Sequence, residues 1–300
     1  MTEFIMLVGF PASGKSTYAE ELREKGYHVH SSDAIREELT GNVNSQDKNT
    51  DVFDTLHKRV KDDLSNGVSC VYDATNMSMK RRKAFLDEIK KYDVYKKCLL
   101  FIVPIDVCKK RNQLRDRQVP DFVFDKMLRQ FDVPMKYEGW DEIKVIANEE
   151  CDYKKLLQQT VNFDQHNSHH KLSLFDHMFR SFRCLNLNAS KNVSYIAVAL
   201  YHHDIGKLIT KSFINSKGEE TDEAHYYGHE HAGAYLFLSG FVLHKINTND
   251  LLYIASLINW HMRPFTWDQS EKARQRDKKL IGEEMYNDIM MLHEADMAAH

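Results

Sequence analysis

The residues from Gly9 to Thr17, GFPASGKST, have the types and spacing of a loop that holds the phosphates of a nucleotide. They match the pattern G-x-x-x-x-G-K-[ST], directly after an apolar run and before a helical pattern. In such a loop the glycines let backbone N–H groups approach the phosphates, the lysine reaches the terminal phosphates, and the hydroxyl after it binds Mg²⁺. The sequence therefore predicts an ATP site. The residues expected there are Gly9, Ala12, Ser13, Gly14, Lys15, Ser16 (also the Mg²⁺ ligand) and Thr17.

A carboxylate and a guanidinium follow the second apolar run, in the stretch HSSDAIREEL. Asp33 and Arg36 are three residues apart and would share one face of a helix that opens there. At the carboxyl end of a strand, Asp33 is placed to accept a proton from an attacking hydroxyl, and Arg36 to hold a phosphate of the acceptor. The alternative for Asp33 is that it caps the helix N-terminus.

Three polar residues, Asp73, Thr75 and Asn76, end the third apolar run in VYDATN. They are expected at the same edge of the sheet, with Asp73 a candidate for the water shell of Mg²⁺ and Thr75 near the acceptor. A turn-forming aspartate explains the position of Asp73 equally well.

The stretch CKKRNQLRDR is rich in basic residues. Arg111 and Arg115 are the candidates for a role in the site, and the stretch also contains Lys109, Lys110 and Arg117. Arg111 and Arg115 are four apart and are predicted on one helical face, where they clamp the transferring phosphoryl group and Arg115 contacts ATP. A solvated basic face is the alternative. Pro120 follows closely and favours a movable lid.

The second half of the chain contains a set of histidines and aspartates instead of a phosphate loop. Projected along the preceding helix, Asp204 falls on the apolar stripe and His203 at its margin, while His202 falls opposite and is predicted at the surface. A buried aspartate beside a buried histidine calls for a cation. His225 is a spare candidate, and His231 points elsewhere. The expected metal ligands, taken together, are His177, His203, Asp204, His229, His261 and Asp296.

Short apolar runs alternate with amphipathic stretches up to about residue 147, which is typical of a parallel sheet with crossover helices. The expected strands are 4–8, 27–30, 68–72, 97–103 and 142–146, and the expected helices include 17–25, 52–64 and 80–92. From residue 171 onward the patterns are helical, after a stretch rich in His and Asn at 162–170. We therefore expect an α/β domain over 1–150 and an all-α domain over 151–300, with the boundary between 148 and 165.

Composition narrows the class of protein. The 300 residues carry a net charge of −3, so any polyanion would need a local basic patch. The five scattered cysteines include no C-x-x-C pair, which argues against a disulfide framework and against a thiolate zinc site. With no signal sequence and no run of membrane-spanning length, a cytoplasmic protein is expected.

The order GFPASGKST, SSDAIR, DATN and KRNQLR…VP over residues 4–147 resembles the phage and bacterial polynucleotide 5′-kinases. The resemblance implies ATP and Mg²⁺ at Lys15 and Ser16, with Asp33 as the general base. It also implies Arg36 and Thr75 near the 3′-phosphate of the acceptor nucleotide, and Arg111 and Arg115 as lid contacts. Small-molecule and tRNA-directed P-loop kinases share much of this pattern.

The order His177, His203–Asp204, Asp296, with HHDIGK and YGHEHAGA, resembles the HD superfamily of metal-dependent phosphohydrolases over residues 162–300. The resemblance implies an all-helical domain with one metal at His177, His203, Asp204 and Asp296. His229 and His261 would add a second metal that Asp204 bridges. Histidine and carboxylate ligands suit Mn²⁺, Ni²⁺, Co²⁺, Fe²⁺ or Zn²⁺.

Together the two halves resemble a bifunctional end-healing enzyme, a polynucleotide kinase-phosphatase. It would phosphorylate 5′-hydroxyl ends of RNA or DNA and remove a 3′-phosphate or open a 2′,3′-cyclic phosphate, in a pathway completed by a ligase. One alternative is a nucleoside, nucleotide or metabolite kinase fused to an HD phosphomonoesterase. Another is a nucleotide sensor without turnover.

Overall fold

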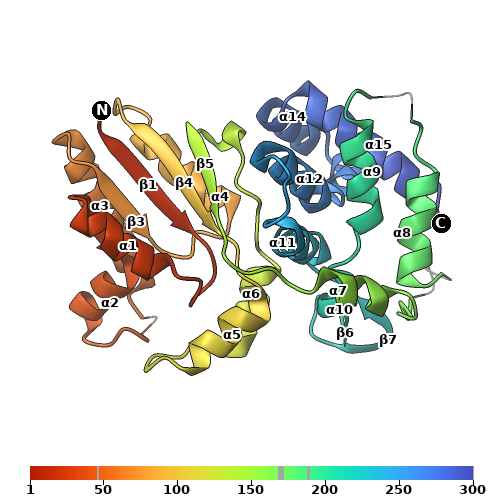
Figure 1. Ribbon diagram of the computed structural model, residues 1–300, viewed down its shortest axis with the longest axis horizontal. Coiled ribbons are helices and arrows are strands. Elements are labelled where there is room, and N and C mark those ends of the chain that lie inside the picture. The colour runs from red at the N-terminus through yellow and green to blue at the C-terminus, as the bar shows by residue number, and fades with distance from the viewer. Residues whose placement is uncertain (46, 168–171, 188–189, 300) are drawn as a thin grey trace. The chain divides into compact units, whose positions relative to one another are not determined.

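The computed structural model describes residues 1–45, 47–167, 172–187 and 190–299 (Figure 1). The chain forms two compact units, one of residues 1–124 and 134–148 and the other of residues 125–133 and 149–300. Part of the stretch rich in His and Asn, residues 168–170, lies outside the described residues.

The first unit is built on a five-stranded parallel sheet in the order β2-β3-β1-β4-β5, coloured red to yellow-green in Figure 1. The α/β fold expected for this half is confirmed, and each strand lies within about two residues of its expected position. The central strand β1 is buried along nearly its whole length, as a strand covered on both faces must be. The strands are β1 (Glu3–Val8), β2 (His28–Ser31), β3 (Cys70–Asp73), β4 (Tyr95–Phe101) and β5 (Glu142–Ile146).

The helices between these strands are amphipathic, and their buried residues recur at helical spacing, such as Val52, Leu56, Val60 and Leu64. They are α1 (Lys15–Glu24), α2 (Ser32–Thr40), α3 (Asn49–Ser65), α4 (Met79–Ile89), α5 (Ile105–Gln113), α6 (Asp121–Leu128) and the short 3₁₀ helix η1 (Lys136–Glu138).

A buried ion pair fixes the loop after β3. Arg82 donates from Nε and Nη2 to the Glu138 carboxylate at 2.8 and 2.7 Å, and both side chains are fully buried. Its Nη1 donates to the carbonyl oxygens of Asn76 and Met77 at 3.0 and 2.9 Å. The pair therefore holds the segment that carries Thr75.

We expect Glu138→Ala to lower the free energy of unfolding by about 3–5 kcal/mol, because it leaves the Arg82 charge buried without its carboxylate. The matched control is Glu142→Ala on β5. Glu142 pairs with Lys97 at 3.1 Å, and both side chains are partly exposed, so the expected loss is about 0–1 kcal/mol. Urea denaturation measures both losses, and equal losses would contradict the prediction.

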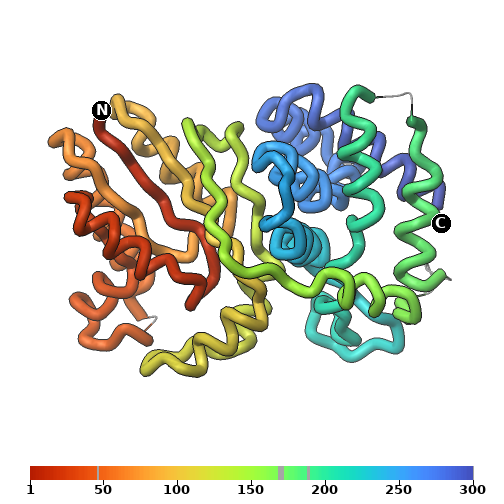
Figure 2. Tube along the Cα trace, in the orientation of Figure 1, coloured from red at the N-terminus to blue at the C-terminus, as the bar shows by residue number. Residues whose placement is uncertain are grey.

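The second unit is mainly helical. Its helix α15 packs against α8 and α9, although more than eighty residues separate α15 from these helices (Figure 2). The helices are α7 (Tyr153–Thr160), α8 (Leu174–Arg183), α9 (Val193–His202), α10 (Lys207–Thr210), α11 (His229–Phe241), α12 (Thr248–Trp260), α13 (Arg263–Gln269), α14 (Glu271–Ile281) and α15 (Glu283–Met297).

The expectation of an all-α second half is wrong in one place, because β6 (Ser212–Ile214) and β7 (Glu220–His225) form an antiparallel hairpin. The residues of the turn between the two strands explain the hairpin. The Asn215 side chain accepts from the N–H groups of Lys217 and Glu219 at 2.9 and 3.0 Å, and Gly218 adopts φ 83°.

The close approach of α11 to the turn after α9 depends on glycine. A Cβ at Gly206 would stand 2.0 Å from the carbonyl oxygen of His229, and one at Gly233 would stand 3.3 Å from the carbonyl oxygen of His203. Glycine at these two positions therefore permits the tight packing of α11 beside His203 and Asp204.

Residues 125–133 pack within the second unit, although strand β5 of the first unit follows them in the sequence. The Val133 N–H donates to Asn259 Oδ1 at 3.1 Å, and the buried Phe131 ring meets Tyr235 edge-on with centroids 5.0 Å apart. The main division lies between Asn148 and Glu149.

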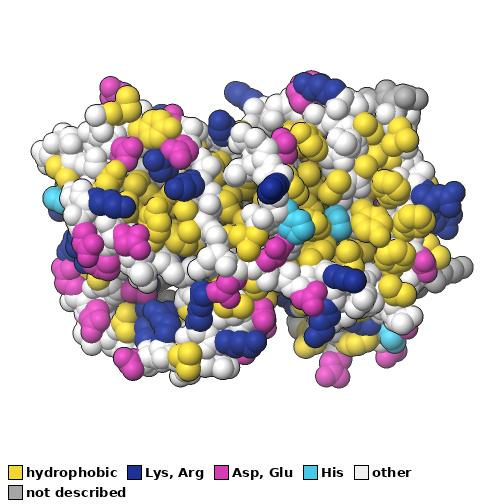
Figure 3. Space-filling model, viewed as in Figure 1, with side chains coloured by type: hydrophobic (Ala, Val, Ile, Leu, Met, Phe, Trp, Pro, Cys, Tyr) yellow, Lys and Arg dark blue, Asp and Glu magenta, His cyan; other side chains and the backbone are white. Residues whose placement is uncertain are grey.

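On the face drawn in Figure 3, basic and acidic side chains are interspersed over both units. None of the helices in the described ranges combines the length and the apolar character needed to cross a membrane.

Candidate phosphate site and candidate metal centre

The phosphate loop joins β1 to α1 with the backbone that this motif requires. Gly9 and Gly14 have φ of 155° and 94°, and Ala12 has φ 61°, so the chain turns tightly under the N-terminus of α1. A Cβ at Gly9 would lie 3.0 Å from Phe101 and Ser13. The Gly9 N–H donates to the Thr75 carbonyl at 3.0 Å, which ties the loop to the end of β3.

Lys15 is folded back onto its own loop. Its Nζ donates to the carbonyl oxygens of Gly9 and Phe10 at 2.9 and 2.6 Å. Burial lowers the pKa of Lys15, while the nearby carboxylates of Asp73 and Asp33 oppose that shift. A phosphate arriving at the loop would supply the negative charge that this buried ammonium lacks.

Ser16 and Asp73 lie together, with Ser16 Oγ donating to Asp73 Oδ2 at 3.4 Å. Burial raises the pKa of Asp73, and the charge of Lys15 acts against this rise. A hydroxyl and a carboxylate side by side are oxygen ligands of the kind that Mg²⁺ takes in proteins.

Asp33 lies in the first turn of α2, and Ser31 occupies the N-cap position without a side-chain cap bond. Capping, the alternative weighed for Asp33, is therefore not its role here. Its Oδ2 instead pairs with Arg117 Nη1 at 2.5 Å, and Arg117 Nε donates to Asn44 Oδ1 at 3.1 Å. The sequence places Arg117 in the basic run but gives no reason to select it.

Arg36 is buried on the same helix. It donates to the Ser45 carbonyl at 3.0 Å and to Asn49 Oδ1 at 2.9 Å. Its Nε is buried without a hydrogen-bond partner among the described residues. A guanidinium with unused donors is suited to an anionic ligand.

The prediction that Arg111 and Arg115 share one helical face is wrong, because α5 ends at Gln113 and Arg115 lies in the bend that follows. Asn112 causes the break. Its side chain donates to the Val119 carbonyl at 2.8 Å and accepts from the Val119 N–H at 3.0 Å, which turns the chain well before Pro120. The charge of Arg115 nevertheless contributes to lowering the pKa of Lys15, so Arg115 is close to the phosphate loop.

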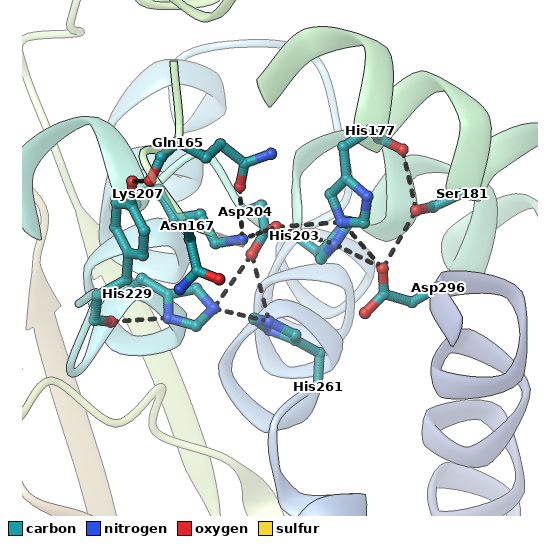
Figure 4. A network of polar contacts seen from close by, with 12 residues as sticks. Gln165, Asn167, His177, Ser181, His203, Asp204, Lys207, His229, His261 and Asp296 are labelled. Carbon is teal, nitrogen blue, oxygen red and sulfur yellow. Dashed lines mark hydrogen bonds and ion pairs between the residues drawn. The ribbon is translucent and has the colours of Figure 1, made fainter. Parts of the chain in front are cut away.

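All six residues expected as metal ligands in the second unit converge (Figure 4). They come from α8, from the turn after α9, from the first residue of α11, from the C-cap of α12 and from the last turns of α15. Within the described part of the chain they form two triads, His177–His203–Asp296 and Asp204–His229–His261, all of them buried.

The two triads meet at Asp204. Its Oδ2 lies 3.3 Å from His177 Nε2 and 3.5 Å from His203 Nε2. Its Oδ1 lies 3.1 Å from His229 Nε2 and 3.7 Å from His261 Nε2. Asp296 Oδ1 completes the first triad, 3.1 Å from His177 and 3.2 Å from His203. One carboxylate thus faces both groups of imidazoles.

Hydrogen bonds on the side away from the centre fix the orientation of three imidazole rings. His203, His229 and His261 each place Nδ1 2.7–2.8 Å from the backbone carbonyl three residues earlier. Only a protonated Nδ1 can donate to a carbonyl, so Nε2 of each neutral ring directs a lone pair into the centre. His203 and His261 follow the ends of α9 and α12, where unpaired carbonyls are available.

These lone pairs need a cation. His229 Nε2 and His261 Nε2 are 3.1 Å apart. The fully buried His203 Nε2 makes no hydrogen bond to any described residue. Buried imidazole nitrogens and carboxylates that converge in this way fit divalent transition metals.

The charges of the centre support this interpretation. Burial by itself would raise the pKa of Asp204, but Lys207 and the histidines outweigh it and hold the pKa well below the usual range. Burial opposes protonation of His177 too, yet Asp204 and Asp296 raise its pKa to about 9. Burial and the neighbouring His229 lower the pKa of His261 to about 3. The two carboxylates therefore stabilise positive charge on the groups around them, as they would stabilise a bound cation.

Lys207 is a second site residue that the sequence analysis did not select. Its Nζ lies 2.7 Å from Asp204 Oδ2, donates to Gln165 Oε1 at 2.9 Å and stands over the Tyr226 ring (Figure 4). It follows Asp204 by three residues in HHDIGK, a spacing that places both on one side of a helical turn and could have pointed to it.

The surface position predicted for His202 is wrong. Tyr153 of α7 covers it, with Tyr153 Oη 3.1 Å from His202 Nδ1, and burial lowers the pKa of His202 to about 3. His231 turns away from the centre, as expected, with Nδ1 3.0 Å from the Phe131 carbonyl. His225 bonds Thr221 and belongs to neither triad.

A pocket of about 360 Å³ opens onto the centre. Its lining includes His177, Asp204, His229, His261 and Asp296 together with Lys207. Ligand sites commonly have volumes of about 300–1,000 Å³.

The first unit is similar to known proteins. Residues 4–134 match a family model described as an AAA domain. Over 153 residues, or 48% of its length, the chain is 26% identical to the bifunctional polynucleotide phosphatase/kinase of Schizosaccharomyces pombe, and spans 33% of that relative. The N-terminal unit is a kinase-type P-loop domain. It is distantly related to that polynucleotide kinase, and ATP with Mg²⁺ is what such a domain uses.

Solved structures show more distant likenesses. A chain in the structure of a Pnkp1/Rnl/Hen1 RNA repair complex is 21% identical, with 43% of each chain covered and a TM-score of 0.39. A putative kinase from Chloroflexus aurantiacus is 16% identical, with 53% of this chain and 93% of that chain covered and a TM-score of 0.42. A gluconokinase from Sinorhizobium meliloti is 18% identical, with 48% and 82% covered and a TM-score of 0.36.

Proposed function

We propose that this protein heals nucleic-acid ends: the first unit transfers the γ-phosphate of ATP to a 5′-hydroxyl, and the second removes a 3′-phosphate or opens a 2′,3′-cyclic phosphate. The observation that carries the proposal is the pair of buried His/Asp triads in a chain whose other half is a kinase-type P-loop domain. Together the two reactions produce the 5′-phosphate and 3′-hydroxyl that a ligase joins.

In the kinase reaction, Asp33 accepts the proton of the attacking 5′-hydroxyl, and Lys15 holds the phosphates of ATP. Arg117 must first release the Asp33 carboxylate, since the two are paired at 2.5 Å. Arg36, with its spare donor, binds the phosphate that follows the 5′-terminal nucleoside, and Thr75 is the second residue that we assign to this phosphate. Arg111 and Arg115 contact the transferring phosphoryl group from the segment around the end of α5.

In the second unit, His177, His203, Asp204 and Asp296 would hold one metal, and His229 and His261 would hold a second, with Asp204 between them. Such metals lower the pKa of water and neutralise the charge that develops on phosphate oxygens. Lys207 keeps Asp204 ionised and places an ammonium at the edge of the pocket, where it can bind the phosphate.

The test uses an oligonucleotide with a 5′-hydroxyl and a 3′-phosphate, read by intact mass. A His203→Ala/Asp204→Ala variant with ATP and Mg²⁺ is expected to add one phosphoryl group. The wild-type protein with Mn²⁺ or Ni²⁺ and no ATP is expected to remove one. Free nucleosides and gluconate serve as competing acceptors. Phosphorylation of these and not of the oligonucleotide would refute the nucleic-acid substrate.

A further inference from the structure

The lining of the pocket at the candidate metal centre is of two kinds. Beside the clustered imidazoles and carboxylates and the polar Asn167, His225 and Glu230, it presents the apolar and aromatic residues Ala224, Tyr226, Tyr227, Met262 and Phe265. A ligand that fills the pocket therefore needs a charged group at one end and an apolar group at the other. A sugar phosphate lacks the second feature, because it has no apolar group to place against the aromatic side chains.

Tyr227 is a half-exposed aromatic ring that is held rigidly. It is 48% exposed, and one face stacks on the ring of His225, with centroids 5.5 Å apart and planes within 8°. Its Oη accepts from the Ser216 N–H at 3.1 Å, and its carbonyl accepts from Arg129 Nη1 at 3.0 Å. His225 is fixed in turn by Thr221, 3.0 Å away.

An exposed aromatic ring that is already fixed loses little conformational entropy when a planar group stacks on it. Phe265 gives the pocket a second exposed ring, at 38%, supported edge-on by His293 with centroids 4.8 Å apart. A nucleobase is the planar, uncharged group that stacks on aromatic side chains, and in a nucleotide one sugar joins it to the phosphate.

We propose that Tyr227 is the stacking platform for the base of the 3′-terminal nucleotide whose phosphate lies at the metal centre. This inference rests on the proposed phosphohydrolase function of the second unit and specifies its substrate: a nucleotide end, recognised through its base without regard to sequence. Stacking accepts every base because every base has a π-face.

The test compares two dinucleotides that carry a 5′-phosphate, which keeps them out of the 5′-hydroxyl kinase reaction, and a non-hydrolysable 3′-methylenephosphonate. In one the 3′-terminal base is the fluorescent 2-aminopurine, and in the other the 3′-terminal sugar is abasic. Binding to the whole chain is measured in the presence of Zn²⁺. The fluorescence of the 2-aminopurine dinucleotide reports its own binding, and the abasic dinucleotide is measured by its ability to displace the fluorescent one. We expect roughly tenfold or greater preference for the base, with quenching of its fluorescence.

Three variants assign the effect. Tyr227→Leu is expected to lose both the preference and the quenching, whereas Tyr227→Phe keeps the ring and both effects. Phe213→Leu is the matched control, since Phe213 is a 42%-exposed aromatic residue on β6, in the hairpin that precedes Tyr227, and is not among the residues that line the pocket. It is expected to behave as the wild type.

Equal binding of the two dinucleotides by the wild type, or quenching that persists in Tyr227→Leu, would overturn the proposal. Release of phosphate from ordinary 3′-phosphorylated oligonucleotides is measured alongside. If base-dependent binding is present and no phosphate is released with any divalent metal, the stacking site stands and the phosphohydrolase function fails. If base-bearing and abasic ends release phosphate at equal rates and bind equally, the function stands and the stacking site fails.

Discussion

Asp204→Asn is expected to reduce the proposed 3′-phosphatase activity by about 10³-fold or more while the proposed 5′-kinase activity stays near the wild-type rate. The loss follows from the position of this carboxylate, which belongs to one triad and also faces the other: it lies 3.1 Å from His229 and 3.3 Å from His177. An amide would have no negative charge to offer to either of the two proposed metals and would present N–H groups to one of them. Metal ions lower the activation free energy of such reactions by several kcal/mol, and each 1.36 kcal/mol is a factor of about ten in rate.

Metal content and phosphatase rate are measured together. The matched control is Asp288→Asn, another buried aspartate of the second unit, which accepts hydrogen bonds from Ser190, Asn192 and Tyr253 and belongs to neither triad. It is expected to keep its metal. A variant Asp204→Asn that retains full metal and full rate would show that the triads are not the catalytic centre.

The convergence of the candidate metal ligands could be expected from the sequence because part of their signal is local. Asp204 lies on the apolar stripe of the preceding helix, and a carboxylate in that position must find a cation. The same reasoning failed for His202, one residue before His203, because its partner Tyr153 is on α7, 49 residues away. Helical projection tells which side a residue faces, and it does not tell what covers that side.

The phosphate loop and the strands were predictable for the same reason, since each depends on a short pattern and a period. The lid was not. Its helix ends at Gln113 because the Asn112 side chain bonds the backbone of Val119, and the resulting bend brings Arg117 to Asp33 across 84 residues. The basic run showed that guanidinium groups are present, but which of them meets the carboxylate depends on that tertiary bend.

The boundaries of the two units could likewise be predicted only in part, as residues 125–133 show. The change from strand to helix patterns marks the division near residue 148. The packing of residues 125–133 within the second unit has no such signal, because the pattern does not change there. It depends on Phe131, buried against Tyr235, and on Asn259, which bonds the Val133 N–H at 3.1 Å. These contacts join residues more than a hundred positions apart.

Asp33→Asn is expected to slow the kinase reaction at saturating substrate by about 10²–10⁴-fold, the usual contribution of a general base, and to leave removal of the 3′-phosphate unchanged. Asparagine preserves the size of the side chain and its place in the first turn of α2, but it cannot accept the hydroxyl proton. The readout is transfer from labelled ATP to an oligonucleotide with a free 5′-hydroxyl. Saturation with both substrates separates the rate of turnover from binding.

The structure supplies a control and a second expectation. Asp106 lies in the first turn of α5 and pairs with Lys110 at an exposed 3.7 Å contact, so Asp106→Asn is expected to keep the wild-type rate of turnover. Arg117→Gln removes the partner of Asp33 without touching the carboxylate, so kinase activity should persist. If Asp33→Asn were as active as Asp106→Asn, another group would have to accept the proton. If Arg117→Gln fell as far as Asp33→Asn, the ion pair itself, rather than a free carboxylate, would be what phosphoryl transfer requires.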